Sequence, residues 1–365
     1  MKILQIIQKK QLRGGEVFAC SLANQLARKG HTSIIVTVFD GDSSLPFDGT
    51  ILSLKGSKAN RSCDWRAWKK LSEIVSTERP DLIQANPGDA LKYAVFSKLI
   101  FGWKVPIVFR NASTISLYIT TPMSRWFNSF LLRFVTYIIS VSIFSRNDFV
   151  RVFPFTTNKI TVITNGVSIP TTKDKTQELF GFPFFVHIGG FTYEKNHKGL
   201  INIFERLRAK YPGATLGLIG DGPLRSEIEA LVVKKGLQDS VIFFGYQSEP
   251  VKYLTAAECF LLPSIIEGMP AVVLESFLHH VPVVAYDVGG VSEMVVPGAT
   301  GWLVKMNEES TFAEAVSEAI ENRDKRMEYT ENAFGSVKEK FCMEEIADRF
   351  RETYLKILQP SKLVK

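Results

Sequence analysis

The sequence is poor in the features that would assign a protein to a class at once. It has four cysteines, Cys20, Cys63, Cys259 and Cys342, and no C-x-x-C pair. This usage excludes a disulfide framework and a cysteine zinc site, and it predicts reduced, buried thiols in a cytoplasmic protein. Repeats with a period of roughly 20–50 residues are also absent, which excludes solenoids and arrays.

Long apolar runs are missing as well. The start, "MKILQIIQKK", has five uncharged residues between its lysines. That is too few for the apolar core of a signal peptide, so we expect a first β-strand there. The most apolar stretch, residues 130–144, is interrupted by Arg133. It is shorter than the ~20 residues that span a bilayer, so we expect no transmembrane helix.

The two halves of the chain differ in charge. Residues 1–170 hold 22 Lys and Arg against 10 Asp and Glu, whereas residues 171–365 hold 22 against 27. A chain of 365 residues is expected to form two domains, and the imbalance indicates different partners for them. The basic half could face nucleic acid, an anionic membrane or a phosphorylated substrate. An ordinary solvated basic surface is the alternative.

Strand-like and helix-like segments alternate along the chain. Helical periodicity follows Gly14 and Gly15 and stops at Gly30, and it returns at residues 64–79. The apolar runs between the helices lack strict alternation, which is typical of buried parallel strands. In the first half these runs are residues 2–7, 32–38, 81–85, 106–110, 137–142 and 159–164. The pattern predicts a doubly wound α/β domain.

A break separates this pattern from a second one. Residues 165–183 hold Gly, Pro and charges without an apolar period, so they predict an interdomain linker. Helices are expected at residues 224–236 and 343–358. The second set of strand-like runs is 184–190, 214–223, 241–245, 258–263, 281–286 and 301–304. Two Rossmann-like domains in series are therefore expected, with ligands beyond the carboxyl ends of their strands.

One stretch, "SIIEGMPAVVLESF" (264–277), places a glutamate among turn formers and a second glutamate in an apolar helix. Pro270 suits the first helical position, and the free amides at the helix start would form an anion site suited to a diphosphate. Glu275 has no solvated face, so it needs a hydrogen-bonding partner such as a ribose. Glu267 would point toward the far end of a nucleotide-sugar. Helix electrostatics for Glu275 and a surface turn for Glu267 are the alternatives.

This stretch resembles the signature of the retaining GT-B glycosyltransferases, in particular glycosyltransferase family four. Five further blocks fit in the right order, at residues 13–31, 162–170, 187–200, 218–229 and 286–304. The resemblance covers most of the chain and implies the GT-B fold, an α/β architecture of two Rossmann-like domains that face a central cleft. It implies an acceptor-binding domain at 1–168, a nucleotide-sugar-binding domain at 169–342, and a C-terminal helix at 343–365 that packs back on the first domain.

The resemblance also implies roles for individual residues. Glu267 would contact the donor sugar or lie near the reacting centre, Glu275 would hold the ribose, and Lys195 would pair with the diphosphate. The remaining contacts would come from Gly14, Gly15, Gly190, Gly245, Tyr246, Gly268 and Met269. A metal-independent reaction without a cofactor is implied, with a UDP- or GDP-sugar as co-substrate.

Two positions depart from the family. Many members carry an arginine on the diphosphate where this chain has Gly190, so Lys195 or the nearby Lys198 would carry more of the charge. Many also carry a histidine where this chain has Arg110 and Asn111, which leaves the acceptor side without that histidine.

These features predict a hexosyltransferase that moves a sugar to a saccharide or lipid-linked acceptor in cell-surface polysaccharide synthesis. A nucleotide-sugar epimerase or hydrolase and a nucleotide-binding subunit without transferase activity are the alternatives. The Asp-x-Asp at 40–42 is a metal pattern of the other major glycosyltransferase fold, but such a pair is common in loops, and we expect no metal site. Residues 117–137 mix aromatics and arginines, either as domain core or as an interfacial patch. With the basic first half, they predict a cytoplasmic enzyme in weak peripheral contact with the inner face of the cell membrane, and no nucleic-acid partner.

Overall fold

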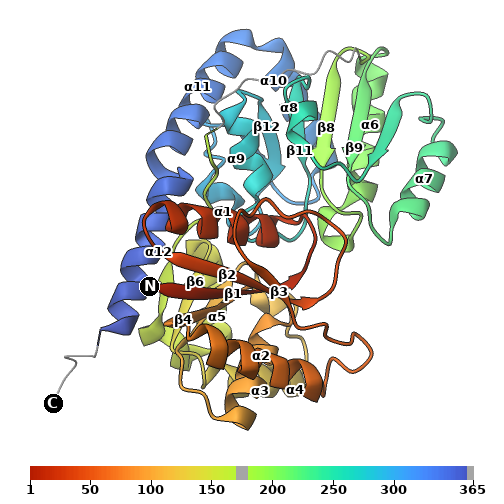
Figure 1. The fold of residues 1–365 in the computed structure, drawn as a ribbon. Helices are drawn as coiled ribbons and strands as arrows, with labels where there is room; N and C mark the ends of the chain where they lie inside the picture. Colours follow the sequence, from red (N-terminus) through yellow and green to blue (C-terminus); the bar gives the residue numbers. More distant parts are fainter. Residues whose placement is uncertain (170–179, 360–365) are drawn as a thin grey trace. The chain divides into compact units, whose positions relative to one another are not determined.

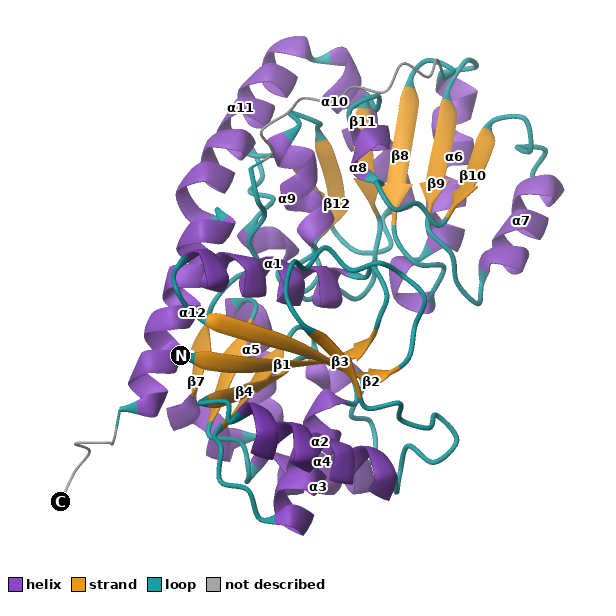
Figure 2. Ribbon diagram, in the orientation of Figure 1, coloured by secondary structure: helices purple, strands orange, loops and turns teal. Residues whose placement is uncertain are grey.

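The computed structural model describes residues 1–169 and 180–359. The chain divides into two compact units: unit 1 is Met1–Ser168 with Met343–Lys365, and unit 2 is Ile169–Cys342 (Figure 1). Each unit is built on one parallel sheet with helices packed against it, as Figure 2 shows. The prediction of two Rossmann-like α/β sheets is confirmed. The middle of the predicted linker, 170–179, and the end of the predicted C-terminal segment, 360–365, lie outside the described residues.

Unit 1 holds a seven-stranded sheet in the order β3-β2-β1-β4-β5-β6-β7. Its strands are β1 (Lys2–Lys9), β2 (Thr32–Phe39), β3 (Ile51–Ser53), β4 (Leu82–Ala85), β5 (Ile107–Asn111), β6 (Tyr137–Ser140) and β7 (Ile160–Val162). The six predicted strands are present with shifted ends. The sequence missed β3, because a strand of three residues is too short to show a period.

Helices cover both faces of this sheet. They are α1 (Gly14–Arg28), α2 (Trp65–Glu78), α3 (Ala90–Phe101), α4 (Pro122–Leu132), α5 (Ile143–Val152) and α12 (Met343–Leu358), with 3₁₀ turns η1 (Ile115–Leu117) and η2 (Pro154–Lys159). Leu4 and Ile6 pack in the core with the residues of α2 and α3. Ile3 packs on the opposite side with Phe18 of α1 and Phe350 of α12, whose rings lie 5.7 Å apart. Burial on both faces explains why the strands read as continuous apolar runs.

Unit 2 repeats the plan with a six-stranded sheet in the order β10-β9-β8-β11-β12-β13. Its strands are β8 (Phe184–Ile188), β9 (Thr215–Ile219), β10 (Val241–Gly245), β11 (Cys259–Leu262), β12 (Val283–Tyr286) and β13 (Trp302–Val304). Its helices are α6 (His197–Lys210), α7 (Arg225–Lys234), α8 (Val251–Leu254), α9 (Ala271–Leu278), α10 (Glu309–Glu321) and α11 (Arg323–Lys340), with 3₁₀ turns η3 (Tyr193–Lys195) and η4 (Val291–Glu293). Phe185 of β8, Phe204 of α6 and Phe312 of α10 share the core.

Two local predictions need correction. Pro270 is the N-cap of α9 with extended backbone (ψ 115°), so the helix starts one residue later than predicted. The helix ends at Leu278, and His280 beyond it adopts a left-handed backbone conformation with φ of 53°. The prediction of buried thiols was wrong for Cys63, which is exposed, whereas Cys20 and Cys259 are buried.

Within the described ranges, none of the helices combines the length and the apolar character that crossing a bilayer requires.

Candidate active site

The loops that follow β8 and β11 are joined at the carboxyl edge of the unit 2 sheet. The main-chain N–H of Ile265 donates a hydrogen bond to the Glu194 carbonyl over 2.8 Å. The Asn196 side-chain amide donates to the Pro263 carbonyl over 3.0 Å, and its oxygen accepts from the N–H of Gly199 in the first turn of α6. A single asparagine therefore starts α6 and ties the first loop to the second.

This connection brings two predicted site residues into contact. The Lys195 Nζ lies 2.5 Å from the Glu267 Oε1, and the lysine and glutamate side chains are 21% and 10% exposed. Because both side chains are largely removed from water, the attraction between them is stronger than in an exposed pair. A cation and a carboxylate are thus held side by side at the end of the sheet, where ligands of such folds bind.

Glycines fix the backbone beside Glu267. Gly289 has φ of +57°, and a Cβ at this position would lie 1.9 Å from the carbonyl oxygen of Glu267. The next residue, Gly290, donates its N–H to the Gly268 carbonyl over 2.8 Å. Met269 is buried. The loop after β12 therefore packs directly on the backbone of residues 267 and 268, and only glycine at position 289 permits that approach.

Glu275 stands in the second turn of α9. Burial raises the pKa of its carboxyl group to about 7. Among the residues that the structure describes, no hydrogen bond or ion pair accounts for this carboxylate. At the start of the same helix, the amides of Ala271 and Val272 precede the first intrahelical bond, which runs from the N–H of Val273 to the Pro270 carbonyl. Within the part of the chain that the structure describes, the helix thus offers a ligand two N–H groups without a partner and one mostly buried carboxylate.

The remaining glycines of unit 2 differ in what they require. A Cβ on Gly190 would meet nothing closer than the Asp221 carbonyl oxygen at 3.4 Å, so this position has room for a side chain. Gly245 has φ of +66° and ends β10, and the adjacent Tyr246 is half exposed. Gly220 has φ of +138°, and its Cβ would lie 2.1 Å from the Gly189 carbonyl oxygen. This third glycine, not predicted as a site residue, fixes the backbone beneath Gly190.

Two buried histidines, also absent from the predicted site, lie behind the β8 loop. The rings of His187 and His197 are 4.9 Å apart, and the ring of His197 stacks on Phe191. Desolvation is the largest cause that lowers the pKa of His187 to about 4 and that of His197 to about 2. The His187 ring is therefore neutral at physiological pH, and its Nδ1 donates a hydrogen bond to the Leu261 carbonyl over 2.8 Å. Both rings therefore support the loop as neutral, packed side chains.

Unit 1 holds the other predicted glycines. Gly14 and Gly15 open α1, and a Cβ on either would meet nothing within 4 Å. Packing therefore does not require glycine at these positions, and there is open space beside the first two residues of the helix. Directly beneath, Glu16 is buried, accepts a hydrogen bond from the Gln11 side chain, and has its pKa raised by desolvation. Glu16 is a titratable residue that the sequence did not single out.

Arg110 and Asn111 are both buried. Arg110 is 1% exposed, lies 3.8 Å above the Phe18 ring and donates a hydrogen bond to the Asn165 side chain. The Asn111 amide donates to the Ser140 hydroxyl over 3.1 Å. The Nε and Nη1 atoms of Arg110 have no hydrogen-bond partner among the described residues.

The predicted Asp-x-Asp loop shows no metal cluster. Asp40 accepts a hydrogen bond from the Ser53 hydroxyl. Throughout residues 1–169 and 180–359, His, Cys, Asp and Glu side chains form no group of three or more that could hold a metal ion.

Two family models match the chain in succession. The model described as Glycosyltransferase Family 4 matches residues 12–169, and the model described as Glycosyl transferases group 1 matches residues 169–335. The second match contains every predicted site residue of unit 2.

Curated relatives match over part of their length. The N-acetylgalactosamine-N,N'-diacetylbacillosaminyl-diphospho-undecaprenol 4-alpha-N-acetylgalactosaminyltransferase of Campylobacter jejuni is 25% identical over 249 residues, which is 66% of this chain and 67% of that protein. An uncharacterized glycosyltransferase of Methanocaldococcus jannaschii is 34% identical over 143 residues, but only 34% of its length is covered. The chain thus spans from a third to two thirds of these relatives.

Solved structures match over almost the whole chain. The crystal structure of HepE from Anabaena in complex with UDP-glucose superposes with a TM-score of 0.83 at 21% identity, covering 98% of this chain and 100% of that one. The sucrose-phosphate synthase of Thermosynechococcus elongatus gives a TM-score of 0.82 at 17% identity, with coverage of 99% and 100%. These likenesses confirm the predicted GT-B fold.

Proposed function

Because the chain belongs to the group 1 glycosyltransferases of family four, we propose that it is a retaining enzyme that transfers a sugar from a nucleotide-diphosphate sugar. The observation that supports this most directly is the contact of Lys195 with Glu267 at the carboxyl edge of the unit 2 sheet. Family membership had assigned these two residues to the diphosphate and the donor sugar, and they come from loops 72 positions apart.

Each polar group of the unit 2 site has a part in this reaction. Negative charge develops on the leaving diphosphate oxygen, and Lys195 with the free amides of Ala271 and Val272 would stabilise it. Glu275 would bind the ribose hydroxyls, because its buried carboxylate otherwise lacks hydrogen-bond donors. Glu267 would hold the donor sugar. Gly14 and Gly15 of unit 1, with Gly190, Gly245, Tyr246, Gly268 and Met269 of unit 2, would supply main-chain contacts and clearance.

The reaction proposed here needs no covalent intermediate. Attack from the face of the leaving group retains the anomeric configuration without a nucleophilic carboxylate. The donor's own diphosphate oxygen would accept the proton of the incoming hydroxyl. A glycosyl-enzyme adduct in the mass spectrum of the protein during turnover would contradict this route.

We propose a UDP- or GDP-hexose as donor, and a saccharide or lipid-linked acceptor of cell-surface glycan synthesis. HepE was solved with UDP-glucose. The name of the C. jejuni relative gives it a diphospho-undecaprenol-linked saccharide as acceptor. The UDP-glucose bound to HepE favours UDP as the first nucleotide to test, and the donor panel below includes the alternatives.

We also propose peripheral contact of unit 1 with the cytoplasmic face of an anionic membrane. Residues 90–147 hold seven Lys and Arg and no Asp or Glu. On this stretch Met123 and Trp126 of α4 are 79% and 69% exposed, and Leu117 and Tyr118 of the preceding turn are half exposed. Apolar side chains within an acid-free, basic segment suit a bilayer that carries anionic headgroups.

Nucleotide binding tests the proposed function. Melting temperatures would be measured with UDP, GDP, ADP and their common sugars, for the wild type and Glu275→Gln. We expect one nucleotide to raise the melting temperature selectively, and the variant to lose most of that shift, because a bound ligand stabilises only the folded state. A flat response of the wild type to the whole panel would contradict the transferase and favour a binding subunit. Turnover of a nucleotide-sugar without an acceptor would favour a hydrolase or epimerase.

A further inference from the structure

The strand order of unit 1 reverses between β1 and β4. In open parallel sheets, the crevice at the carboxyl ends of the two strands that flank such a reversal is where ligands bind. Here the chain leaves β4 through Asn86, whose N–H donates to the Ile6 carbonyl of β1 over 3.0 Å. It then turns at Gly88, which packs against Gln8, and enters α3 at Asp89. Asp89 therefore stands at the reversal point.

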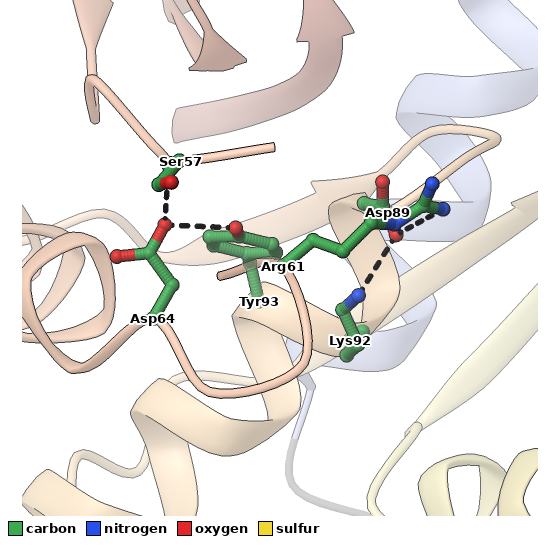
Figure 3. A network of polar contacts seen from close by, with 6 residues as sticks. All are labelled: Ser57, Arg61, Asp64, Asp89, Lys92 and Tyr93. Atoms are coloured by element: carbon green, nitrogen blue, oxygen red, sulfur yellow. Dashed lines mark hydrogen bonds and ion pairs between the residues drawn. The ribbon is translucent and has the colours of Figure 1, made fainter. Parts of the chain in front are cut away.

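Figure 3 shows a network of two carboxylates at this place, and the two are bonded very differently. Asp64 is complete. Its Oδ1 accepts from the N–H of Ala67 over 3.2 Å. Its Oδ2 accepts from the N–H of Ser57 over 2.7 Å and from the Tyr93 hydroxyl over 3.0 Å. These bonds cap α2 and hold the loop that follows β3, which is a structural role.

The Asp89 carboxylate, by contrast, has hydrogen-bond partners on only one of its two oxygens in the described part of the chain. Its Oδ1 contacts both the Lys92 Nζ at 2.9 Å and an Arg61 guanidinium nitrogen at 3.2 Å. Its Oδ2 is buried, and no hydrogen-bond partner for it exists among residues 1–169 and 180–359. The side chain as a whole is 8% exposed. Figure 3 shows both cations at one oxygen. Asp89 also occupies the N-cap position of α3 without capping the helix.

A buried carboxylate oxygen without a donor is unfavourable, and in native proteins a water, an ion or a ligand usually completes such a group. The charges around Asp89 limit what that ligand can be. Lys92 and Arg61 together exceed the charge of the Asp89 carboxylate by one, so a third cation would be repelled. A fully ionised anion has no proton to donate, so it cannot supply the hydrogen bond that Oδ2 lacks. A neutral O–H group avoids both conflicts and supplies the missing donor.

We propose that Asp89 is a binding residue for the acceptor, and that its Oδ2 accepts a hydrogen bond from a hydroxyl group of a saccharide. This inference rests on the proposed transferase function and adds a residue of unit 1 that would bind the saccharide acceptor. Arg61 is 58% exposed on the loop that follows β3 and contacts only Oδ1, so its interaction leaves the second oxygen of Asp89 for the sugar hydroxyl.

Saturation-transfer NMR with free monosaccharides tests the proposal. The probes are glucose, galactose, mannose, N-acetylglucosamine and N-acetylgalactosamine, each titrated into the full-length chain in the presence of UDP. We expect the wild type to bind at least one of these sugars. Asp89→Ala should bind that sugar about tenfold or more weakly, because the sugar hydroxyl loses its hydrogen bond to the aspartate carboxylate.

Two control variants separate binding from structure. Arg61→Ala removes the exposed cation on the same oxygen, and it should keep the sugar affinity. Asp64→Ala removes the carboxylate whose two oxygens are both hydrogen-bonded. This variant should lower the melting temperature more than Asp89→Ala does. Wild-type affinity in Asp89→Ala, a wild type that binds none of the sugars, or an equal loss in Arg61→Ala would overturn the proposal. The UDP-induced rise in melting temperature, measured on the same samples, reports separately on the donor site and so on the proposed function itself.

Discussion

The Lys195 Nζ lies 2.5 Å from the Glu267 Oε1, so the cation assigned to the diphosphate is held by the carboxylate assigned to the sugar. In the free protein each group neutralises the other while both are largely buried. We expect a donor that brings a diphosphate to Lys195 to weaken this pair and to leave Glu267 for the sugar hydroxyls. In the free protein the contact would hold both side chains in position.

Replacement of Lys195 by Met should lower the transfer rate about 100-fold or more, since a charge that stabilises the leaving group is lost. Lys198→Met is the matched control, because Lys198 lies three residues further on the same segment and is exposed. Its rate should stay within about twofold of the wild type, as expected of a surface charge in salt. Steady-state release of UDP from UDP-sugar measures both. If the Lys198 variant lost as much activity as the Lys195 variant, the assignment to Lys195 would be wrong.

Glu275 should make the stability of the nucleotide-free protein depend on pH. Burial raises its pKa from the usual 4.5 to about 7 in the folded state, so the folded chain binds the proton more tightly than the unfolded chain does. Stability from this group is therefore full below pH 4.5 and is lost as the pH rises to about 7. Glu275→Gln lacks this titration. The Glu275 side chain is mostly but not completely buried, so we expect a gain of less than about 3 kcal/mol for the variant at pH 8.

Melting temperatures of the wild type and Glu275→Gln at pH 5, 6, 7 and 8 measure this effect without nucleotide. The melting temperature of Glu275→Gln should rise relative to that of the wild type as the pH rises. A constant difference across the series would mean that the carboxylate is solvated or paired in solution.

Gly289→Ala should disrupt the donor site. A methyl group there would lie 1.9 Å from the carbonyl oxygen of Glu267, so the loop that carries Glu267 must move. Gly298→Ala is the matched control. It has a similar left-handed φ of +75°, but its Cβ would meet only the Tyr329 hydroxyl at 3.9 Å. Both variants should lose about 1 kcal/mol from the backbone conformation, and only Gly289→Ala should also lose the UDP-induced rise in melting temperature. Equal UDP responses would show that the Glu267 loop tolerates the displacement.

The parts of the molecule that the sequence predicted are those that local patterns determine. Continuous apolar runs identified the strands because both faces of each sheet are buried. The glutamate pair of residues 267 and 275 was visible because an acidic residue in an apolar helix is unusual. The glycine at position 289 gave no such signal, since its requirement comes from the carbonyl of a residue 22 positions away.

The parts that the sequence missed depend on contacts between distant segments. Asp89 and Asp64 look alike as isolated aspartates before a helix, and only their hydrogen bonds distinguish a complete carboxylate from an incomplete one. The contact of His187 with His197 likewise becomes apparent only when β8 and α6 are packed together. The sequence predicted Pro270 as the first helical residue of α9, whereas it is the N-cap. Proline suits both positions, so the residue type alone could not distinguish them.

Gly190→Arg should strengthen donor binding. Many family members carry arginine on the diphosphate at this position, and a Cβ here would meet no atom closer than 3.4 Å. An added guanidinium near a diphosphate should lower the dissociation constant of UDP about fivefold or more, as expected for a charge-assisted bond. Gly190→Ala is the control for the backbone change, and calorimetric titration with UDP measures both. Unchanged affinity in the arginine variant would place the diphosphate away from position 190.

Met123→Ala/Trp126→Ala should weaken binding to anionic vesicles. These two side chains are the most exposed apolar groups of the acid-free segment 90–147, so their loss removes the apolar part of the proposed membrane contact. Co-sedimentation with vesicles of phosphatidylcholine alone, and of phosphatidylcholine with phosphatidylglycerol, measures the effect. The wild type should bind only the anionic vesicles, and less so in high salt, since headgroup attraction is screened.

Met327→Ala provides the matched control for this last prediction. Met327 is 55% exposed on α11 of unit 2, outside the basic segment, so its removal should leave vesicle binding unchanged. The double variant should bind anionic vesicles about tenfold more weakly, because two large apolar side chains no longer enter the interface. If the wild type did not bind anionic vesicles, or if Met327→Ala lost as much vesicle binding as the double variant, this surface would be excluded as a membrane contact. The positive charge of the segment would then favour a phosphorylated acceptor.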